Sequence, residues 1–361
     1  MPQEITVKTL SDWGIPLKSA FFIAGPCSAE SEEQMMQTAL SLKDSEAIVL
    51  RAGIWKPRTR PGTFEGVGVK GLDWLKNAGR AANLLATTEV ATPEHVEACL
   101  RHEIDILWIG ARTTSNPFAV QAIADVLTGV DIPVLVKNPI NPDIELWLGA
   151  LERFNQAGIK RLAAVHRGFS TYEKTQFRNQ PIWRIPIEVR RRNPDIPMIC
   201  DPSHICGNTD LLFSVSQNAM DLLFDGLMVE VHIDPSAALS DAKQQVTPDE
   251  YNRLINRLTI KKASSEEKDY LEHMNNLRKE IDQVDHEILK LLAKRMERSN
   301  RIALHKMKDN VSIFQPRRWD EVVKSRIEYG LDHNLSEDFV LKLYQLINEE
   351  AIQLQGKVIS D

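Results

Sequence analysis

Eight short apolar runs, separated by polar segments with helical signals, constrain this chain more than any other feature of its sequence. The runs are rich in β-branched residues and lie at residues 21–25, 47–53, 83–90, 105–111, 133–138, 161–166, 197–204 and 226–232. Between the third and fourth runs, Thr92 is placed to cap a helix that has Pro93 at its first position. Strands that alternate with helices predict a parallel sheet. The count of eight favours a closed (β/α)8 TIM barrel, although an open doubly wound sheet produces a similar pattern.

The pattern of apolar residues changes from strand-like to helix-like after Leu258. No β-like run follows, and apolar residues recur at helical spacing, at positions 277, 281, 284, 288, 291 and 292. We expect a long helix over about 266–308, a second helix that ends at Gly330, and a third that begins after Ser336 and runs through Gln355. The predicted organisation is a barrel over 1–260, a linker over 261–270 and a small all-α domain of three helices over 271–361.

The helical domain is too small to bury a large core by itself, since it has only about 90 residues. The apolar seam of its first helix has a period near 3.5 residues, which is typical of helices that pair with a second copy. We therefore expect a homodimer formed through this domain.

Composition excludes several classes of protein. Hydrophobic residues make up 43% of the chain and charged residues 26%, a balance typical of soluble globular proteins. The net charge of −6 argues against nucleic-acid and membrane partners, which favour a basic excess. No signal peptide and no run of about 18 apolar residues is present, so we expect a cytoplasmic protein. Four cysteines in so long a chain form no disulfide framework, so each is interpreted as a buried thiol or a ligand.

Four residues near strand ends have side chains that bind metals: Cys27, His204, Glu230 and Asp241. The C-terminal strand ends of a barrel converge on one active site. A thiolate, an imidazole and two carboxylates suit a divalent ion such as Mn²⁺, Co²⁺, Fe²⁺ or Zn²⁺. Glu230 lies in a strand that is predicted to be buried, where a cation would offset the cost of its charge. Each residue alone is more often a core cysteine, a satisfied histidine or a solvated acid.

A second set near the strand ends is cationic, and its members are Arg51, Lys56, Arg58, Arg112, Lys137 and Arg167. Arginine and lysine bind phosphate and carboxylate oxygens, so convergence of these side chains predicts phosphorylated acids or sugars as substrates. Taken singly, each is more often a surface charge that covers an apolar face. A reaction at this site would need a group that moves protons, and the candidates are Lys137 or a water held near Glu89 and His166. The sequence does not choose between them.

These residues lie in motifs that resemble those of 3-deoxy-D-arabino-heptulosonate 7-phosphate (DAHP) synthases. The motifs are "IAGPCSAES", "LRAGIWKPRT", "GAR", "VLVKNP", "HRGF", "DPSH", "GLMVEVH" and "SDAKQQV", and they occur in order over residues 21 to about 258. The resemblance implies a (β/α)8 barrel that condenses phosphoenolpyruvate with erythrose 4-phosphate. Only a short segment precedes the first run, so we expect no N-terminal regulatory domain.

The resemblance also implies roles for individual residues. It places the metal on Cys27, His204, Glu230 and Asp241, and phosphoenolpyruvate on Arg112, Lys137 and Arg167 with help from Arg51. It assigns erythrose 4-phosphate to the segment Lys56, Pro57, Arg58 and Thr59. The related octulosonate 8-phosphate synthases typically have Ala-Asn in place of Pro57 and Arg58, which favours the four-carbon sugar. Arg60 stands where the family often has serine.

The helical region contains a second candidate site. Arg295 and Lys306 are eleven residues apart, which places them on one helix face roughly 16 Å apart. Arg278 lies roughly 80 to 100° around the helix from them, so it would serve a shared site best from a second copy. From spacing alone, solvated surface charges are the more probable interpretation.

The segments "LRKEIDQVDHEILKLLAKRMERSNRIALHKMK" and "LINEEAIQLQ" resemble an all-helical chorismate mutase over residues 271 to about 355. The resemblance implies that chorismate is bound by Arg278, Arg295, Lys306, Arg318 and Gln355. Lys306 and Gln355 would stabilise charge on the breaking ether oxygen during the rearrangement to prephenate. Trp319, Gln315 and Ala351 replace polar residues of some members, which predicts reduced turnover or a pocket adapted to sensing.

We therefore expect a bifunctional enzyme, in which prephenate bound at the helical domain inhibits the barrel. Two alternatives remain at this point. The helical domain could be a catalytically silent module for ligand sensing and dimerisation, or the barrel could be an octulosonate 8-phosphate synthase. A test with chorismate separates the first alternative, and a test with arabinose 5-phosphate separates the second.

Overall fold

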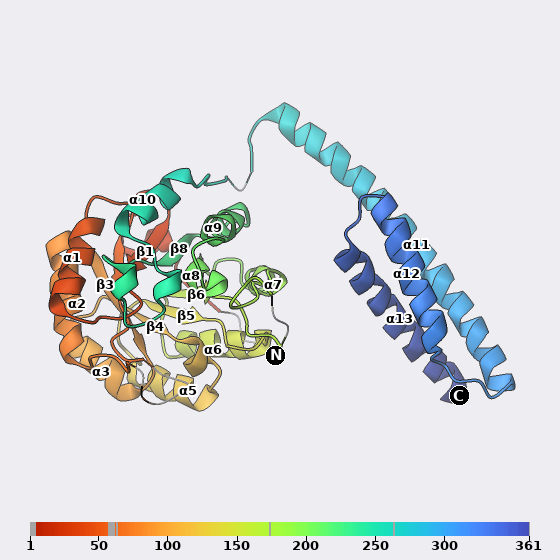
Figure 1. Ribbon diagram of the computed structural model, residues 1–361, viewed down its shortest axis with the longest axis horizontal. Coiled ribbons are helices and arrows are strands. Elements are labelled where there is room, and N and C mark those ends of the chain that lie inside the picture. The colour runs from red at the N-terminus through yellow and green to blue at the C-terminus, as the bar shows by residue number, and fades with distance from the viewer. Residues whose placement is uncertain (1–4, 57–61, 63, 173–174, 263, 361) are drawn as a thin grey trace. The chain divides into compact units, whose positions relative to one another are not determined.

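A computed structural model describes residues 5–56, 62, 64–172, 175–262 and 264–360 of the chain. The chain forms two compact units, Met1–Ala263 and Ser264–Asp361. In the first unit, eight parallel strands close into a barrel in the order β1 to β8 (Figure 1). The strands are β1 Phe21–Gly25, β2 Val49–Arg51, β3 Leu85–Val90, β4 Ile106–Ile109, β5 Val134–Lys137, β6 Leu162–His166, β7 Met198–Cys200 and β8 Gly226–Glu230. Each strand lies within one of the eight predicted runs, so the barrel prediction is confirmed.

Helices connect the strands and surround the barrel (Figure 1). They are α1 Glu32–Leu42, α2 Lys70–Ala82, α3 Pro93–Arg101, α4 Ala111–Thr114, α5 Pro117–Val126, α6 Ile144–Gln156, α7 Arg184–Arg192, α8 Pro202–Cys206, α9 Leu212–Asp221 and α10 Pro248–Arg257. Side-chain caps define several of their starts. Thr92 accepts a hydrogen bond from the N–H of His95 at 3.4 Å and Pro93 begins α3, as the sequence predicts.

Side chains that alternate along the strands form two separate hydrophobic cores, one inside the barrel and one between the barrel and its helices. Inward-facing residues such as Ile23, Trp108 and Met228 fill the barrel, and Trp13 of the 3-10 helix η1 Leu10–Trp13 packs with them. Outward-facing residues such as Leu50 and Val229 pack beneath the helices. Because successive side chains of a strand point to opposite faces, the last inward position of each strand points into the mouth of the barrel.

The seventh predicted strand is shorter than its apolar run indicates. β7 ends at Cys200, and the short helix α8 begins at Pro202, so His204 lies on a helix. Asp201 caps this helix by accepting a hydrogen bond from the N–H of His204 at 3.1 Å. Pro202 lacks an N–H to donate to a strand ladder but fits the first turn of a helix, which explains the early end of the strand.

The second unit consists of α11 Lys268–Lys308, α12 Pro316–Asp332 and α13 Glu337–Ser360, and α13 packs against both other helices. Ser336 caps α13 by accepting a hydrogen bond from the N–H of Phe339 at 3.3 Å. We predicted that the second helix ends at Gly330, but α12 continues to Asp332. A side chain at Gly330 would instead meet Val340 of α13 at 2.5 Å, so this glycine permits close packing of two helices.

The apolar seam of α11 is largely exposed in the single chain. Ile281, Val284, Ile288 and Leu291 are all exposed large hydrophobic residues. Among the described residues, no helix combines the length and hydropathy that crossing a bilayer requires.

Candidate active site

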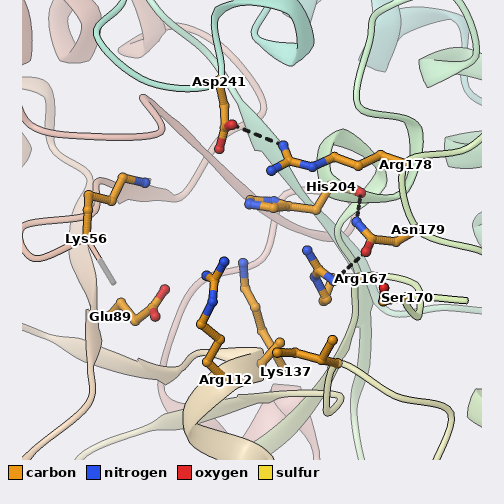
Figure 2. A pocket seen from close by; sticks show the side chains of 12 residues that line it. Lys56, Glu89, Arg112, Lys137, Arg167, Ser170, Arg178, Asn179, His204 and Asp241 are labelled. Atoms are coloured by element: carbon orange, nitrogen blue, oxygen red, sulfur yellow. Dashed lines mark hydrogen bonds and ion pairs between the residues drawn. The ribbon is translucent and has the colours of Figure 1, made fainter. Parts of the chain in front are cut away.

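A cavity of about 350 Å³ lies at the C-terminal ends of the barrel strands (Figure 2). Its walls come from at least six different segments of the chain and are mostly polar. The lining residues are Lys56, Glu89, Ala111, Arg112, Lys137, Ile140, Arg167, Ser170, Arg178, Asn179, His204 and Asp241. The barrel therefore gathers many of the predicted strand-end residues into one site.

Three of the four predicted metal ligands form a tight cluster beside this cavity, and the fourth, His204, lies next to Glu230. Ligand atoms of Cys27, Glu230 and Asp241 are all within 4.8 Å of one another. The Cys27 Sγ is 3.4 Å from Asp241 Oδ2, and His204 Nε2 is 3.7 Å from Glu230 Oε1. The cluster joins residues from the two ends of the barrel sequence, because β1 and β8 are neighbours in the closed sheet.

Asp201 orients the histidine of this cluster. The fully buried carboxylate lies 2.9 Å from His204 Nδ1 and accepts a hydrogen bond from Lys137 Nζ at 2.7 Å. Burial alone would raise the pKa of Asp201, but His204 and Lys137 outweigh it and hold the pKa well below its usual value. Since Nδ1 faces Asp201, the other ring nitrogen of His204 faces Glu230, an arrangement common among metal-binding histidines.

Glu230 is an ionised carboxylate held inside the protein. Burial raises its pKa, but His204 and Arg51 lower it more, so the net shift is downward. Arg51 Nη2 lies 3.2 Å from Glu230 Oε1, and both side chains are almost completely buried. The Arg51 guanidinium also lies over the ring of Trp108, with 4.9 Å to the ring centroid. Breaking this ion pair would leave a buried unpaired charge, so it is important for folding as well as for the site.

Cys27 is a protonated thiol at neutral pH in this arrangement. Burial and the nearby charge of Glu230 raise its pKa to about 12, although Lys56 lowers it in part. Lys56 Nζ lies 2.9 Å from the Cys27 Sγ. A divalent cation at this cluster would replace the thiol proton, since metals bind the thiolate. The soft sulfur, the imidazole and two carboxylates fit such a cation. Glu230 Oε1 is paired with Arg51 but accepts no hydrogen bond from the described residues.

Cationic side chains form the rest of the cavity wall. Figure 2 shows Arg112 and Lys137 pointing into the cavity from the bottom of the view, Arg167 lying to the right and Lys56 to the left. Desolvation lowers the pKa of Arg167 to about 10, so it remains charged at neutral pH. Lys137 lies over the same Trp108 ring as Arg51, at 5.4 Å from the centroid. This wall can bind an anion with several oxygens, such as a phosphorylated carboxylate.

Glu89 and His166 have different surroundings. Glu89 lines the cavity and accepts a hydrogen bond from Trp108 Nε1 at 3.0 Å. His166 does not line it, contrary to our prediction, because Val165 takes the inward position of β6 and the next side chain must point outward. The His166 ring is buried among Trp147, Phe169 and Trp183. Pro57, Arg58 and Thr59 lie outside the described residues.

Several residues of the site escaped the sequence analysis. Arg178 and Asn179 come from the segment between β6 and α7, and Gln244 follows Asp241 in the 3-10 helix η3 Ala242–Gln244. Asn179 Oδ1 accepts a hydrogen bond from Arg167 at 2.9 Å, and its Nδ2 donates one to the carbonyl of His204 at 2.6 Å (Figure 2). No periodicity marks these positions. Asp201 could have been recognised from the sequence, since an aspartate directly before a proline is typical of the residue that caps the start of a helix.

The helical unit contains a smaller polar cluster. Gln355 of α13 is buried and donates a hydrogen bond to Ser299 of α11 at 2.7 Å. Arg295 lies one turn before Ser299 and is partly buried, which lowers its pKa. Lys306 donates a hydrogen bond to the carbonyl of Ile313. Arg278 and Arg318 are exposed, and Arg318 forms an ion pair with Glu321 at 2.8 Å.

A closed parallel barrel with a cationic cavity at its C-terminal mouth defines a TIM-barrel enzyme that acts on anionic substrates. Comparison with known proteins identifies which one. The chain belongs to the DAHP synthetase I family, whose model matches residues 18–266. The model of chorismate mutase type II matches residues 277–356.

Individual relatives agree with these matches. Phospho-2-dehydro-3-deoxyheptonate aldolase of Thermotoga maritima is 34% identical over 257 residues, which are 71% of this chain and 73% of that protein. A crystal structure of the T. maritima DAHP synthase superposes with a TM-score of 0.62 at 31% identity and covers 70% of this chain and 72% of that one. The 4-amino-4-deoxychorismate mutase of Streptomyces venezuelae is 32% identical over 87 residues, which are 24% of this chain and 84% of that protein.

The chain is therefore an enzyme of the shikimate pathway that fuses a DAHP synthase to a chorismate mutase. These matches confirm the prediction of a bifunctional enzyme.

Proposed function

We propose that the cavity of the barrel binds phosphoenolpyruvate against Arg112, Lys137 and Arg167, and that the synthase reaction depends on a divalent cation held by Cys27, His204, Glu230 and Asp241. The observation that carries the proposal is the juxtaposition of the cationic wall with this cluster around one cavity. Arg51 supports the cluster through Glu230. Lys56 contacts Cys27 and faces the same cavity, which suits a contact with erythrose 4-phosphate together with Pro57, Arg58 and Thr59.

In the proposed reaction, C3 of phosphoenolpyruvate bonds to the aldehyde carbon of the sugar as the C=C and C=O π bonds open, and water adds at C2. The C2–O bond to phosphate then breaks and C2 becomes a ketone carbon. Of the two protons that the water gives up, one goes to the former aldehyde oxygen and one leaves with the phosphate. A bound cation would supply Lewis acidity to the aldehyde oxygen. Arg112 and Arg167 hold the carboxylate and phosphate oxygens, and Lys137 Nζ can donate to the same anion because Asp201 accepts only one of its hydrogens. Glu89 lies close enough to the cavity to hold the attacking water.

The proposal is tested by following phosphoenolpyruvate consumption by the whole protein with erythrose 4-phosphate or arabinose 5-phosphate. Each sugar is tried after chelation and again after addition of Mn²⁺, Co²⁺, Fe²⁺ or Zn²⁺. We expect consumption only with erythrose 4-phosphate and only with a metal present, and Mn²⁺ is our first choice. Full activity in the chelated protein would refute the metal requirement.

We propose that chorismate binds in the helical unit between Arg295, Lys306 and Gln355, with Arg318 at the edge of the site. The buried amide of Gln355 and the partly buried Arg295 support this placement. The rearrangement to prephenate is unimolecular, so these side chains act by holding a compact conformer and by donating hydrogen bonds to the breaking ether oxygen. Since Trp319, Gln315 and Ala351 offer no carboxylate or hydroxyl, we expect a weak hold on the substrate hydroxyl and reduced turnover.

Replacement of Lys306 tests this site. Lys306→Ala should lower kcat/KM for chorismate about 100-fold, the scale expected for loss of a donor to developing charge. Lys308→Ala, at an exposed position of the same helix, is the matched control. Equal chorismate turnover in the two variants would remove Lys306 from the site.

We propose that two chains pair through the exposed seam of α11 and that Arg278 of each chain serves the site of the other. The seam supports this because a row of exposed large apolar residues along a helix is costly in water. Sedimentation velocity of the whole protein should give twice the chain mass, and a monomer at micromolar concentration would refute the pairing.

We propose that prephenate bound at the helical unit inhibits the synthase. The fusion of the two enzymes supports this proposal, because it couples a late product of the pathway to the barrel. Prephenate should lower the rate of the wild-type synthase, and Lys306→Ala should require much more prephenate for the same effect. A flat response of the wild-type protein would reject the proposal.

We also propose a cytoplasmic location. Four free, buried cysteines fit a reducing compartment, and cell fractionation checks it.

A further inference from the structure

Gln244 is a buried amide with both ends engaged by functional residues. Only 1% of its surface is exposed. Its Nε2 donates a hydrogen bond to Glu230 Oε2 at 2.6 Å, and its Oε1 accepts one from Arg178 Nη1 at 2.7 Å. An amide can satisfy these two partners in only one orientation, since Glu230 can only accept and Arg178 can only donate. Gln244 thus has a fixed donor that points at one oxygen of Glu230.

This hydrogen bond distinguishes the two oxygens of Glu230. Oε2 is occupied by Gln244, whereas Oε1 lies 3.7 Å from His204 Nε2 and 3.2 Å from Arg51 Nη2. Oε1 forms the ion pair with Arg51 but accepts no hydrogen bond from the described residues. Of the two oxygens, Oε1 is therefore the one on the side of His204 Nε2, a predicted ligand atom.

Arg178 extends the same arrangement to Asp241. Its Nη1 lies 3.1 Å from Asp241 Oδ1 (Figure 2). The other oxygen, Oδ2, faces the Cys27 Sγ at 3.4 Å. The backbone of Asp241 is left-handed, with φ of +47°, which is uncommon for a residue with a side chain. A single guanidinium nitrogen therefore contacts both the amide that holds Glu230 and the carboxylate of Asp241.

We infer that Gln244 is a positioning residue for the divalent-cation site and that Arg178 aligns it with Asp241. Gln244 does not bind the cation. It occupies Glu230 Oε2 so that Oε1 faces the cation, and Arg178 holds one oxygen of Asp241 so that the other faces the same point. The inference rests on the proposed metal site. Residues outside the ligand set that hydrogen-bond to ligands typically change metal affinity by about 10- to 100-fold when replaced.

The test is Mn²⁺ binding to the whole chelated protein, measured by electron paramagnetic resonance titration without substrates. Gln244→Met keeps the length of the side chain and removes both hydrogen bonds. We expect the Kd for Mn²⁺ to rise about 10- to 100-fold. Gln37→Met, at an exposed position of α1, is the matched control and should bind as the wild type does. Thermal unfolding of the metal-free proteins is measured alongside.

The outcomes separate the competing explanations. If Gln244→Met binds Mn²⁺ with the wild-type Kd, the inference is overturned. If this variant also unfolds at a lower temperature than the wild type, Gln244 has a structural role alone. If Gln244→Met does not fold, Arg178→Met decides the question, because this side chain is nearly half exposed and its loss disturbs little packing. The Kd of Arg178→Met should rise, and an unchanged Kd overturns the inference. A wild-type protein that binds no Mn²⁺, Co²⁺, Fe²⁺ or Zn²⁺ refutes the cation site itself and the inference with it.

Discussion

The barrel and the helical unit place their functional charges in opposite ways. In the barrel, Arg51, Lys137 and Glu230 are buried, and each is paired with a group of opposite charge in the same chain. In the helical unit, Arg278 and Arg318 are exposed, and the apolar seam of α11 is exposed with them. The barrel site is organised by buried contacts within one chain, whereas the proposed pairing would bring Arg278 of a second chain to the helical site. The synthase should therefore depend on buried contacts within the barrel, and the mutase should depend on association of two chains.

The largest expected effect is a loss of synthase activity that leaves the helical unit unaffected. Cys27→Ala should lower the rate of phosphoenolpyruvate consumption by at least about 1000-fold, because loss of a bound Lewis acid costs several kcal/mol of transition-state stabilisation. Chorismate turnover by the same protein should remain at the wild-type level, and circular dichroism should show an intact fold. Wild-type synthase activity in the chelated variant would exclude Cys27 from the reaction.

The second prediction is a loss of mutase activity when two chains can no longer associate through their helical units. Ile288→Glu puts a charge in the exposed seam and should separate the two chains, which sedimentation velocity detects as a halved mass. Chorismate turnover should fall about 100-fold, since Arg278 of the second copy no longer reaches the site. Lys290→Glu, at an exposed position two residues along the helix, is the control and should stay dimeric. A monomeric Ile288→Glu protein with full mutase activity would show that one chain completes the site.

A smaller effect separates the stabilities of the two units. Gly330→Ala places a Cβ 2.5 Å from Val340, and overpacking of this kind costs about 1–3 kcal/mol. The helical transition in thermal circular dichroism should move to lower temperature while synthase activity is unchanged. Gly356→Ala is the matched control, because its Cβ meets no atom within 4 Å. Equal shifts in the two variants would mean that helix propensity, and not packing, controls the effect.

The last prediction is a pH dependence of stability that is confined to the barrel. Burial lowers the pKa of His166 from 6.5 to about 3. Below about pH 6.5 the unfolded chain takes up a proton that the folded chain refuses, so stability is lost as the pH falls from 6.5 towards 3. His166→Phe should reduce this loss, measured by urea unfolding at pH 7 and pH 4.5 with tryptophan fluorescence. His102→Phe is the control, and identical acid sensitivity of His166→Phe and the wild type would contradict the assignment.

Local patterns predicted the eight strands, the long first helix and the caps at Thr92 and Ser336, because each depends on residues close together in the chain. The same patterns extended the seventh strand too far, since an apolar run does not show where the chain turns. They also placed His166 in the cavity, although the inward position of Val165 excludes it. Chemistry and motifs marked Cys27, His204, Glu230 and Asp241 as candidate ligands, which remains a prediction. Arg178, Asn179 and Gln244 carried no comparable signal in the sequence.

Periodicity, capping residues and strand-end chemistry are local properties, so the order of residues alone specified a barrel, a helical unit and the candidate ligands. Contacts between distant segments are different in kind. Closure of the sheet brings β1 beside β8 and so places Cys27 next to Glu230, and packing of the segment after β6 brings Arg178 to Gln244 and Asp241. Cys27 and Glu230 lie more than 200 positions apart in the sequence. Only the tertiary fold determines which oxygen of a buried carboxylate meets a donor and which is left for a ligand.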